Sequence, residues 1–155
     1  MRVGLMLLAV GACSTPDDTR FAELQRRGAA AMGVDQYTSN HVFETLPDGG
    51  RILLRRDPAD TAGVATIRAH MRTIAARFAA GDFSLPGEVH AQAVPGADVM
   101  RSRRAHIRYF ADTTRGGGTV RIRTTDSVAL AAVHRFLAFQ RQDHRAPGHD
   151  HERGS

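Results

Sequence analysis

Apolar residues recur at helical spacing in the middle of the chain, after the dipeptide Asp57-Pro58. They follow one another at intervals of three or four residues, at Val64, Ile67, Met71, Ile74 and Phe78. An aspartate suited to the N-cap, a proline in the first turn and a glycine at position 81 bound this stretch. The pattern predicts a helix from about residue 58 to residue 80 with one buried face.

Two other stretches show the same periodicity. Residues 20–32 carry Phe21 and Leu24 ahead of an alanine-rich run, and Gly33 follows as a stop signal. After Asp126, which is suited to the N-cap, apolar residues again lie on one helical face. They are Val128, Ala132, Val133, Phe136 and Phe139. The pattern therefore predicts one helix near the start of the chain and one near its end.

Alternating apolar and polar residues indicate strands in two further places. The runs "HVFETL" and "RILLR" flank a turn at residues 47–50, and "HIRYFA" and "TVRIRT" flank a glycine turn at residues 116–118. Alternation from residue 89 to residue 94 indicates a strand that links the two halves, ended by Pro95-Gly96. A short helical turn is expected over residues 99–104.

A hairpin followed by a helix thus occurs twice. We therefore expect a single α+β domain over residues 20–144, in which two hairpin–helix (ββα) units form one antiparallel sheet with helices packed on one face. Residues 145–155 are polar and contain His149 and His151, so we expect a disordered tail.

The first residues resemble an export signal. Arg2 precedes an apolar run over residues 3–10, which is too short to span a bilayer, and Val-Gly-Ala-Cys resembles a lipobox. We expect a signal peptide at residues 1–12, a lipidated Cys13 and a tether at residues 13–19. Ser14 in place of an aspartate favours the outer membrane, facing the periplasm. An ordinary secretory signal or a core strand with a buried cysteine are the alternatives.

Composition excludes several kinds of chemistry. All 21 basic residues are arginine, so Schiff-base chemistry and a Walker-type phosphate loop, which need lysine, are ruled out. The net charge is +5, but 16 acidic residues are interspersed with the arginines. This indicates a solvated basic surface that meets a protein or anionic lipid and does not bind nucleic acid.

No catalytic residue stands out. The chain has no Gly-x-Ser-x-Gly elbow and no Gly-x-Gly-x-x-Gly after a strand, and its acidic residues lie mainly at turns and caps. We therefore rank an enzyme behind a binding or interaction protein.

Histidine is the remaining source of chemistry. The chain has eight histidines and five methionines, and imidazole and thioether are ligands of copper, with imidazole also serving zinc. No His-x-x-x-His pair lies on a predicted helix, so a site must combine separate elements. The candidates are His41, His70, His90 and His134, although a half-exposed structural histidine is the simpler interpretation of each.

We expect His70 and His90 to share one polar site, with His41 or His134 as its third member. His134 projects away from the apolar face of its helix. A metal bound there needs neutral imidazoles, so its affinity should weaken as the pH falls through about 6.5. The tail histidines should bind divalent ions only weakly.

Several motifs together resemble a family of small, mostly uncharacterised bacterial proteins. They are "MGVDQYTSNHVFETLPDGG", "IRAHM", "FAAGDFSLPGEVHAQAVPG", "RGGGTVRI" and "AAVHRFLAFQRQDH". Some members of that family carry the name aspartate carbamoyltransferase, but this chain lacks the Ser-Thr-Arg-Thr motif and the lysine of that enzyme. The resemblance implies a shared fold and brings no activity with it.

Two functions are therefore expected. The first is an exported, lipid-anchored protein that captures a transition metal through histidines, copper ahead of zinc. The second is a non-enzymatic structural or interaction lipoprotein that uses its arginine-rich surface.

Overall fold

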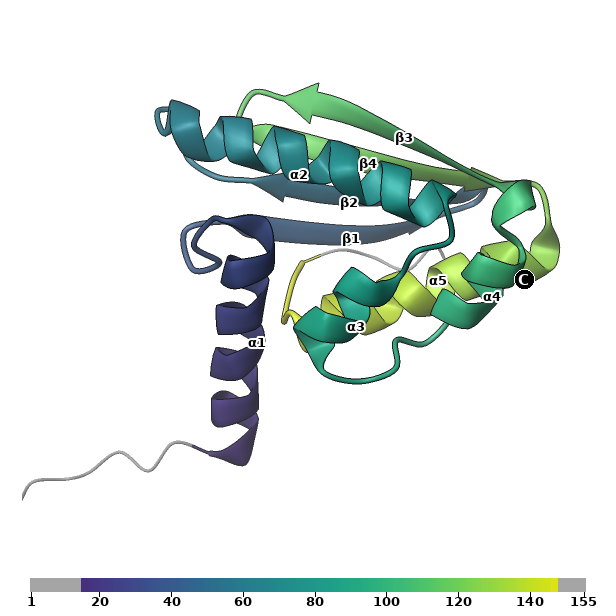
Figure 1. Ribbon diagram of the computed structural model, residues 1–155, viewed down its shortest axis with the longest axis horizontal. Coiled ribbons are helices and arrows are strands. Elements are labelled where there is room, and N and C mark those ends of the chain that lie inside the picture. The colour runs from purple at the N-terminus through teal and green to yellow at the C-terminus, as the bar shows by residue number, and fades with distance from the viewer. Residues whose placement is uncertain (1–14, 148–155) are drawn as a thin grey trace, which may run out of the picture.

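A computed structural model describes residues 15–147, and these form a single α+β domain, which confirms the expected fold class (Figure 1). The helices are α1 (Pro16–Met32), α2 (Thr61–Ala79), α3 (Ser84–His90), α4 (Ala97–Ser102) and α5 (Ser127–Asp143), with a 3-10 turn, η1, at Arg104–His106. The strands are β1 (Asn40–Leu46), β2 (Gly49–Arg55), β3 (Ile107–Thr114) and β4 (Gly117–Thr124). The predicted signal peptide, Cys13, His149 and His151 lie outside the described residues.

The four strands form an antiparallel sheet in the order β1-β2-β4-β3, so the two hairpins meet along β2 and β4. Ile52 lies opposite Val120, and each stands three residues after the glycine that begins its strand. Gly49 lies opposite Arg123, and Arg55 opposite Gly117. The register is therefore symmetric about the Ile52–Val120 pair, as a duplicated ββα unit requires.

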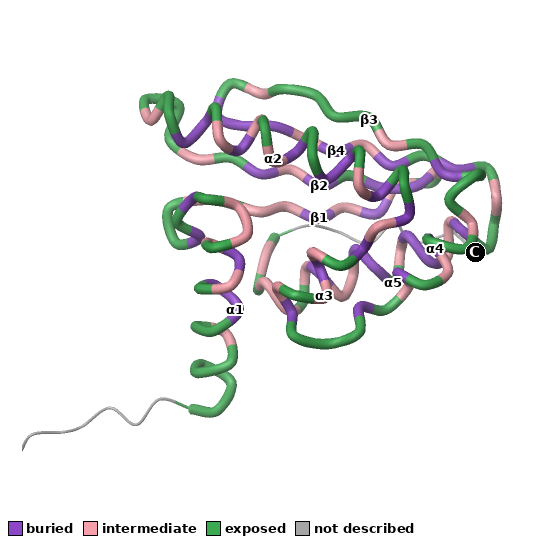
Figure 2. The backbone as a smooth tube through the Cα atoms, viewed as in Figure 1, coloured by how far each residue is buried: buried purple, intermediate pink, exposed green. Residues whose placement is uncertain are grey.

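Each long helix crosses to the hairpin of the other unit. Helix α2 packs on β3 and β4, whereas α5 packs mainly on β1 and β2. The two helices begin alike, since Asp60 accepts a hydrogen bond from the Gly63 N–H at 2.9 Å and Asp126 from the Ala129 N–H at 2.8 Å. Between them lies the core, where the rings of Phe78 and Phe136 meet edge to face at 5.7 Å. Figure 2 shows buried residues lining this interior.

The predicted linking strand does not form, and this prediction was wrong. The chain makes helix α3 at Ser84–His90, which ends at Ala91 in the left-handed conformation (φ 52°). Asp82 accepts hydrogen bonds from the backbone N–H and hydroxyl of Ser84, and the ring of Phe83 stacks on Phe78 at 4.5 Å. These contacts fix the start of a helix where alternation suggested a strand.

Helix α1 begins earlier than the apolar pattern predicts. Thr15 is its N-cap and accepts a hydrogen bond from the Asp18 N–H at 3.2 Å, and Pro16 occupies the first turn. Residues 16–19, which the sequence assigned to the tether, are therefore helical. The helix projects from one end of the domain in Figure 1 and packs on α3, where Arg27 Nε donates to the Val89 carbonyl at 2.7 Å.

The segment after α5 returns along β1. Ala146 packs against the core, and the Phe43 N–H donates to the Pro147 carbonyl at 3.4 Å. Arg145 lies over the ring of Phe21 in α1 at 4.4 Å. Residues 145–147 are thus packed on the domain, although the sequence placed them in the disordered tail. Within residues 15–147, no helix is long and apolar enough to cross a membrane.

Candidate functional site

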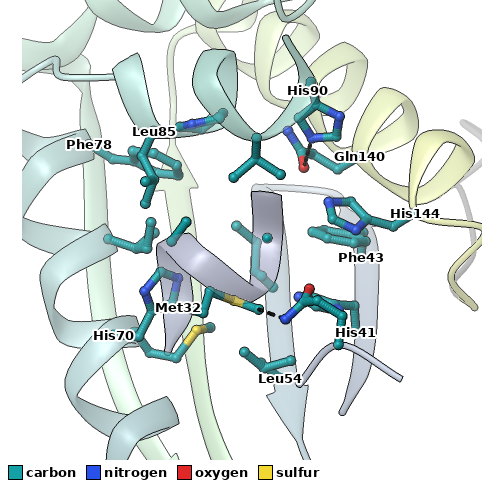
Figure 3. A pocket seen from close by; sticks show the side chains of 18 of the residues that line it. Met32, His41, Phe43, Leu54, His70, Phe78, Leu85, His90, Gln140 and His144 are labelled. Atoms are coloured by element: carbon teal, nitrogen blue, oxygen red, sulfur yellow. Dashed lines mark hydrogen bonds between the residues drawn. The ribbon is translucent and has the colours of Figure 1, made fainter. Parts of the chain in front are cut away.

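One cavity of about 80 Å³ lies where α1, α2, α3 and α5 meet β1 and β2. Most of its wall is apolar, with Phe43, Leu54 and Phe78 among the lining residues (Figure 3). Four histidines also line it: His41, His70, His90 and His144. We call it the histidine cavity. Two methionines, Met32 and Met71, add thioethers to the wall, and none of the described lining residues is an aspartate or glutamate.

The cavity contains three of the four predicted candidates. His41 comes from β1, His70 from α2, and His90 from the last turn of α3. His134 lies elsewhere, because its Nε2 is 2.9 Å from the Leu46 carbonyl at the end of β1. The structure therefore brings His70, His90 and His41 to one place and leaves His134 out.

His144 was missed because the sequence places it at the last residue of the domain, next to the polar tail. It is the C-cap of α5 and follows Phe136 and Gln140 at intervals of four residues. All three line the cavity. Extending the apolar face of α5 by one further turn would have found it, since residues four apart lie on one helical face.

Three of the four imidazoles are in direct ring contact. The centroids of His41 and His144 are 4.9 Å apart with the rings inclined by 26°, and those of His90 and His144 are 5.0 Å apart and nearly perpendicular. Two imidazoles that share a metal ion, with each nitrogen about 2.0–2.1 Å from it, hold their centroids roughly 5 Å apart. The spacing is also ordinary for packed aromatic rings, so it permits metal ligation without indicating it. In Figure 3, His70 lies on the opposite wall, with Met32 between it and His41.

Burial lowers the pKa of three of the cavity histidines, namely His41, His70 and His144. It lowers the pKa of His41 from its ordinary value near 6.5 to about 4, with a smaller contribution from His70. Burial likewise lowers the pKa of His70 to about 4, helped by the positive charge of Arg77. The pKa of His144 falls to about 2, chiefly through burial and then through His41 and His90. Their nitrogen lone pairs are therefore free of protons at neutral pH.

His90 is held by two neighbours on α5. Its Nδ1 is 2.5 Å from an oxygen of Asp143, and its Nε2 is 2.8 Å from the Gln140 Oε1. Asp143 also accepts a hydrogen bond from Arg20 of α1 at 3.3 Å. A carboxylate that accepts from one imidazole nitrogen fixes the ring and its tautomer, which is a common arrangement behind metal-ligating histidines.

Some polar atoms of this region have no partner. The Nδ1 of His144 and the Oε1 of Gln36 are both buried and make no hydrogen bond with the described residues. The Nε2 of Gln140 is also buried and makes no hydrogen bond with the described residues. Buried polar atoms are nearly always satisfied, so these three atoms leave hydrogen-bonding capacity for water or a ligand in this cavity.

The imidazoles are not, however, already arranged around a common point. Among residues 15–147, no group of three or more histidine, cysteine, aspartate or glutamate side chains is positioned to hold a metal ion. The near-parallel stacking of His41 on His144 accounts for part of this, because lone pairs lie in the ring planes and do not converge in a stack. Rotation of either ring about its Cβ–Cγ bond would redirect them.

Comparison of the chain with models of known protein families, with curated proteins and with solved structures gave no match. The resemblance seen in the sequence motifs therefore stays a prediction.

Proposed function

We propose that this protein binds copper(I) in the histidine cavity. The observation that carries the proposal is the contact between His41, His90 and His144 in a cavity whose described wall contains no carboxylate. A thioether is a soft ligand that favours copper(I), and imidazole is a borderline ligand that serves both copper and zinc. A divalent ion would place more charge in this apolar cavity than a monovalent one, and the Asp143 carboxylate behind His90 would offset it only in part.

The ligands proposed are His41 and His144, with the thioether of Met32 as a third. His144 has a buried nitrogen without a partner, and His41 stacks on it. Met32 of α1 lines the same cavity, and its sulfur is 4.0 Å from the Gln36 amide nitrogen. His90 is already engaged by Asp143 and Gln140, so its role is to hold the His144 ring in place by edge-to-face contact.

Competition with a coloured copper(I) chelator under reducing conditions tests this proposal. The full chain is used with Cys13→Ser, His149→Ala and His151→Ala, because a thiol and exposed imidazoles would bind copper themselves. We expect one copper ion per chain. Replacing both His41 and His144 by Phe should weaken binding by more than about a hundredfold, because two of three ligands are lost and losing even a partner behind a ligand costs up to that factor.

The matched control is His106→Ala, which removes an exposed histidine outside the cavity. It should leave the copper affinity unchanged. Equal affinities for the double variant and the parent chain, or tighter binding of zinc than of copper, would refute the proposal.

We also propose that the protein is exported and anchored at Cys13 to the outer membrane, facing the periplasm. The lipobox-like Val-Gly-Ala-Cys sequence supports this. Helix α1 begins three residues after Cys13 and contains 17 residues, so it is about 25 Å long. In an anchored protein it would act as a spacer between the membrane and the histidine cavity, to which its last turn contributes Met32.

The alternative, an interaction protein with an arginine-rich surface, has less support. Many of the arginines are paired within the chain. Arg51 pairs with Glu44 at 2.5 Å, and both Arg121 and Arg123 pair with Asp48. Their charge is thus partly neutralised by neighbours before any partner arrives.

A further inference from the structure

The two edges of the sheet differ. At one end, β1 is accompanied by the C-terminal segment, whose Pro147 carbonyl accepts a hydrogen bond from the Phe43 N–H. At the other end, β3 pairs with β4 alone among the described strands, and it forms the upper border of the domain in Figure 1. Its residues from 110 to 113 are all exposed, as the colouring of Figure 2 shows for this strand. An edge of this kind is a template for pairing with another strand.

The backbone of β3 alternates between its partner strand and the outside. Thr114 pairs with Gly117 across a two-residue turn, so the even-numbered residues direct their backbone groups toward β4. The hydrogen bond of Thr113 agrees with this alternation. Its backbone N–H donates to the Oδ1 atom of the adjacent Asp112 at 2.7 Å and not to a carbonyl of β4. Tyr109, Ala111 and Thr113 therefore direct their N–H and C=O groups away from the sheet.

The side chains on the solvent face of β3 are self-complementary. Arg108, Phe110 and Asp112 lie there at intervals of two residues, and all three are exposed, Phe110 by 52%. If a second β3 lies antiparallel with Phe110 at the centre, Arg108 of each copy lies opposite Asp112 of the other. An aromatic pair is then flanked by two opposite-charge pairs, and each such pair stabilises a sheet.

We propose that β3 pairs with β3 of a second copy of this chain, so that two four-stranded sheets become one continuous sheet. The backbone agrees with this register, since it places outward-directed Tyr109 opposite outward-directed Ala111 of the partner subunit. Phe110 then occupies the non-hydrogen-bonded central position, where cross-strand side chains are closest. A symmetric pair of charges favours an identical chain over an unrelated strand.

Disulfide cross-linking tests the register. In the full chain with Cys13→Ser, Phe110→Cys places two thiols opposite each other across the symmetry axis, within the span of a disulfide. We expect a covalent dimer under mild oxidation. The control is Arg108→Cys, which lies opposite residue 112 and not opposite itself, so it should cross-link far less. Equal cross-linking of the two variants, or none in either, would overturn the proposed register.

Charge reversal tests the pairing without cysteine. Arg108→Asp or Asp112→Arg alone places like charges at both flanking positions, and we expect each to raise the dimer dissociation constant about tenfold. The double variant Arg108→Asp/Asp112→Arg restores opposite charges and should recover dimerisation. Sedimentation equilibrium on the full chain measures this, and circular dichroism checks the fold. A monomeric parent chain, or a double variant no tighter than the single variants, would overturn the proposal.

Discussion

His41, His70 and His144 stay uncharged in the folded protein at a pH where the unfolded chain would hold their protons. Their pKa values in the folded state are about 4, about 4 and about 2, against an ordinary value near 6.5. Between pH 6.5 and pH 4 the unfolded state therefore binds more protons, so the free energy of unfolding falls as the pH falls. At pH 5 each imidazole costs about 2 kcal/mol of stability relative to neutral pH.

The first prediction concerns this pH dependence. Replacing His144 by Phe removes one of the three groups that take up a proton on unfolding. We expect the loss of stability between pH 7.5 and pH 5 to shrink by about one third, because two such groups remain. Urea unfolding at the two pH values measures it. His106→Ala, at an exposed position, should keep the full pH dependence. An unchanged pH dependence in His144→Phe would contradict the assigned burial.

The same shifts change the expected pH dependence of copper binding. An ordinary histidine site would lose affinity as the pH falls through about 6.5. The lowered pKa values of His41 and His144 move proton competition to pH 4 and below. We expect copper(I) affinity to stay nearly constant from pH 7.5 to pH 5, as chelator competition at several pH values would show. A loss of about tenfold by pH 6 would show that ordinary, exposed histidines bind the metal.

Among the elements, the connection from α3 to α4 is held by a glycine that no other residue can replace easily. Gly96 has φ 85°, and a Cβ at this position would lie 2.3 Å from the Ala132 carbonyl oxygen in α5. Gly96→Ala should therefore destabilise the domain by about 2 kcal/mol or more. Thermal and urea unfolding measure this directly.

Gly87 provides the matched control. It lies inside α3, and an added Cβ would be 3.8 Å from the Gln92 carbonyl oxygen, an ordinary van der Waals contact. Gly87→Ala should leave stability unchanged or raise it by up to about 1 kcal/mol, because alanine favours the helix. Similar destabilisation by both substitutions would contradict the close packing of Gly96 on α5.

Elements whose apolar pattern repeats over many residues could be predicted from the sequence, and short elements could not. Helix α2 carries its apolar face through 19 residues, and both hairpins have turn residues at their centres. Helix α3 has only seven residues, and Val89, Ala91 and Ala93 imitate the alternation of a strand. What makes it a helix is contact with Phe78 on α2, which a local pattern does not contain.

The residues of the site were likewise predictable only in part. His41, His70 and His90 were selected from the sequence, but their convergence depends on how β1, α2 and α3 pack around one cavity. His144 was missed because it stands at the boundary of a polar tail, where one more helical turn decides between solvent and core. A single sequence contains no signal for that last turn beyond the four-residue spacing from Gln140.

For the molecule as a whole, the duplicated units form the scaffold and supply three of the four cavity histidines, and the added helices supply His90 and Met32. Helices α1 and α3 lie outside the two ββα units, and both line the histidine cavity. The cavity therefore lies where the symmetry of the fold is broken. This arrangement also connects the site to the N-terminal segment through α1.

The proposed anchor makes a prediction of its own. Cys13→Ser should abolish acylation and move the protein from the membrane fraction to the soluble fraction, because a lipid chain supplies the attachment. Fractionation with metabolic labelling by a fatty acid measures both effects. An unchanged membrane fraction would contradict lipidation at Cys13.

The most direct test of the copper proposal is X-ray absorption at the copper edge. The chain with Cys13→Ser, His149→Ala and His151→Ala is loaded with one equivalent of copper(I), so that the described histidines are the main imidazole source. We expect two imidazole nitrogens at about 2.0 Å with the outer-shell scattering of histidine rings, and one sulfur at about 2.3 Å. A spectrum that lacks histidine scattering, or that is unchanged by His41→Phe and His144→Phe together, would contradict copper binding in the histidine cavity.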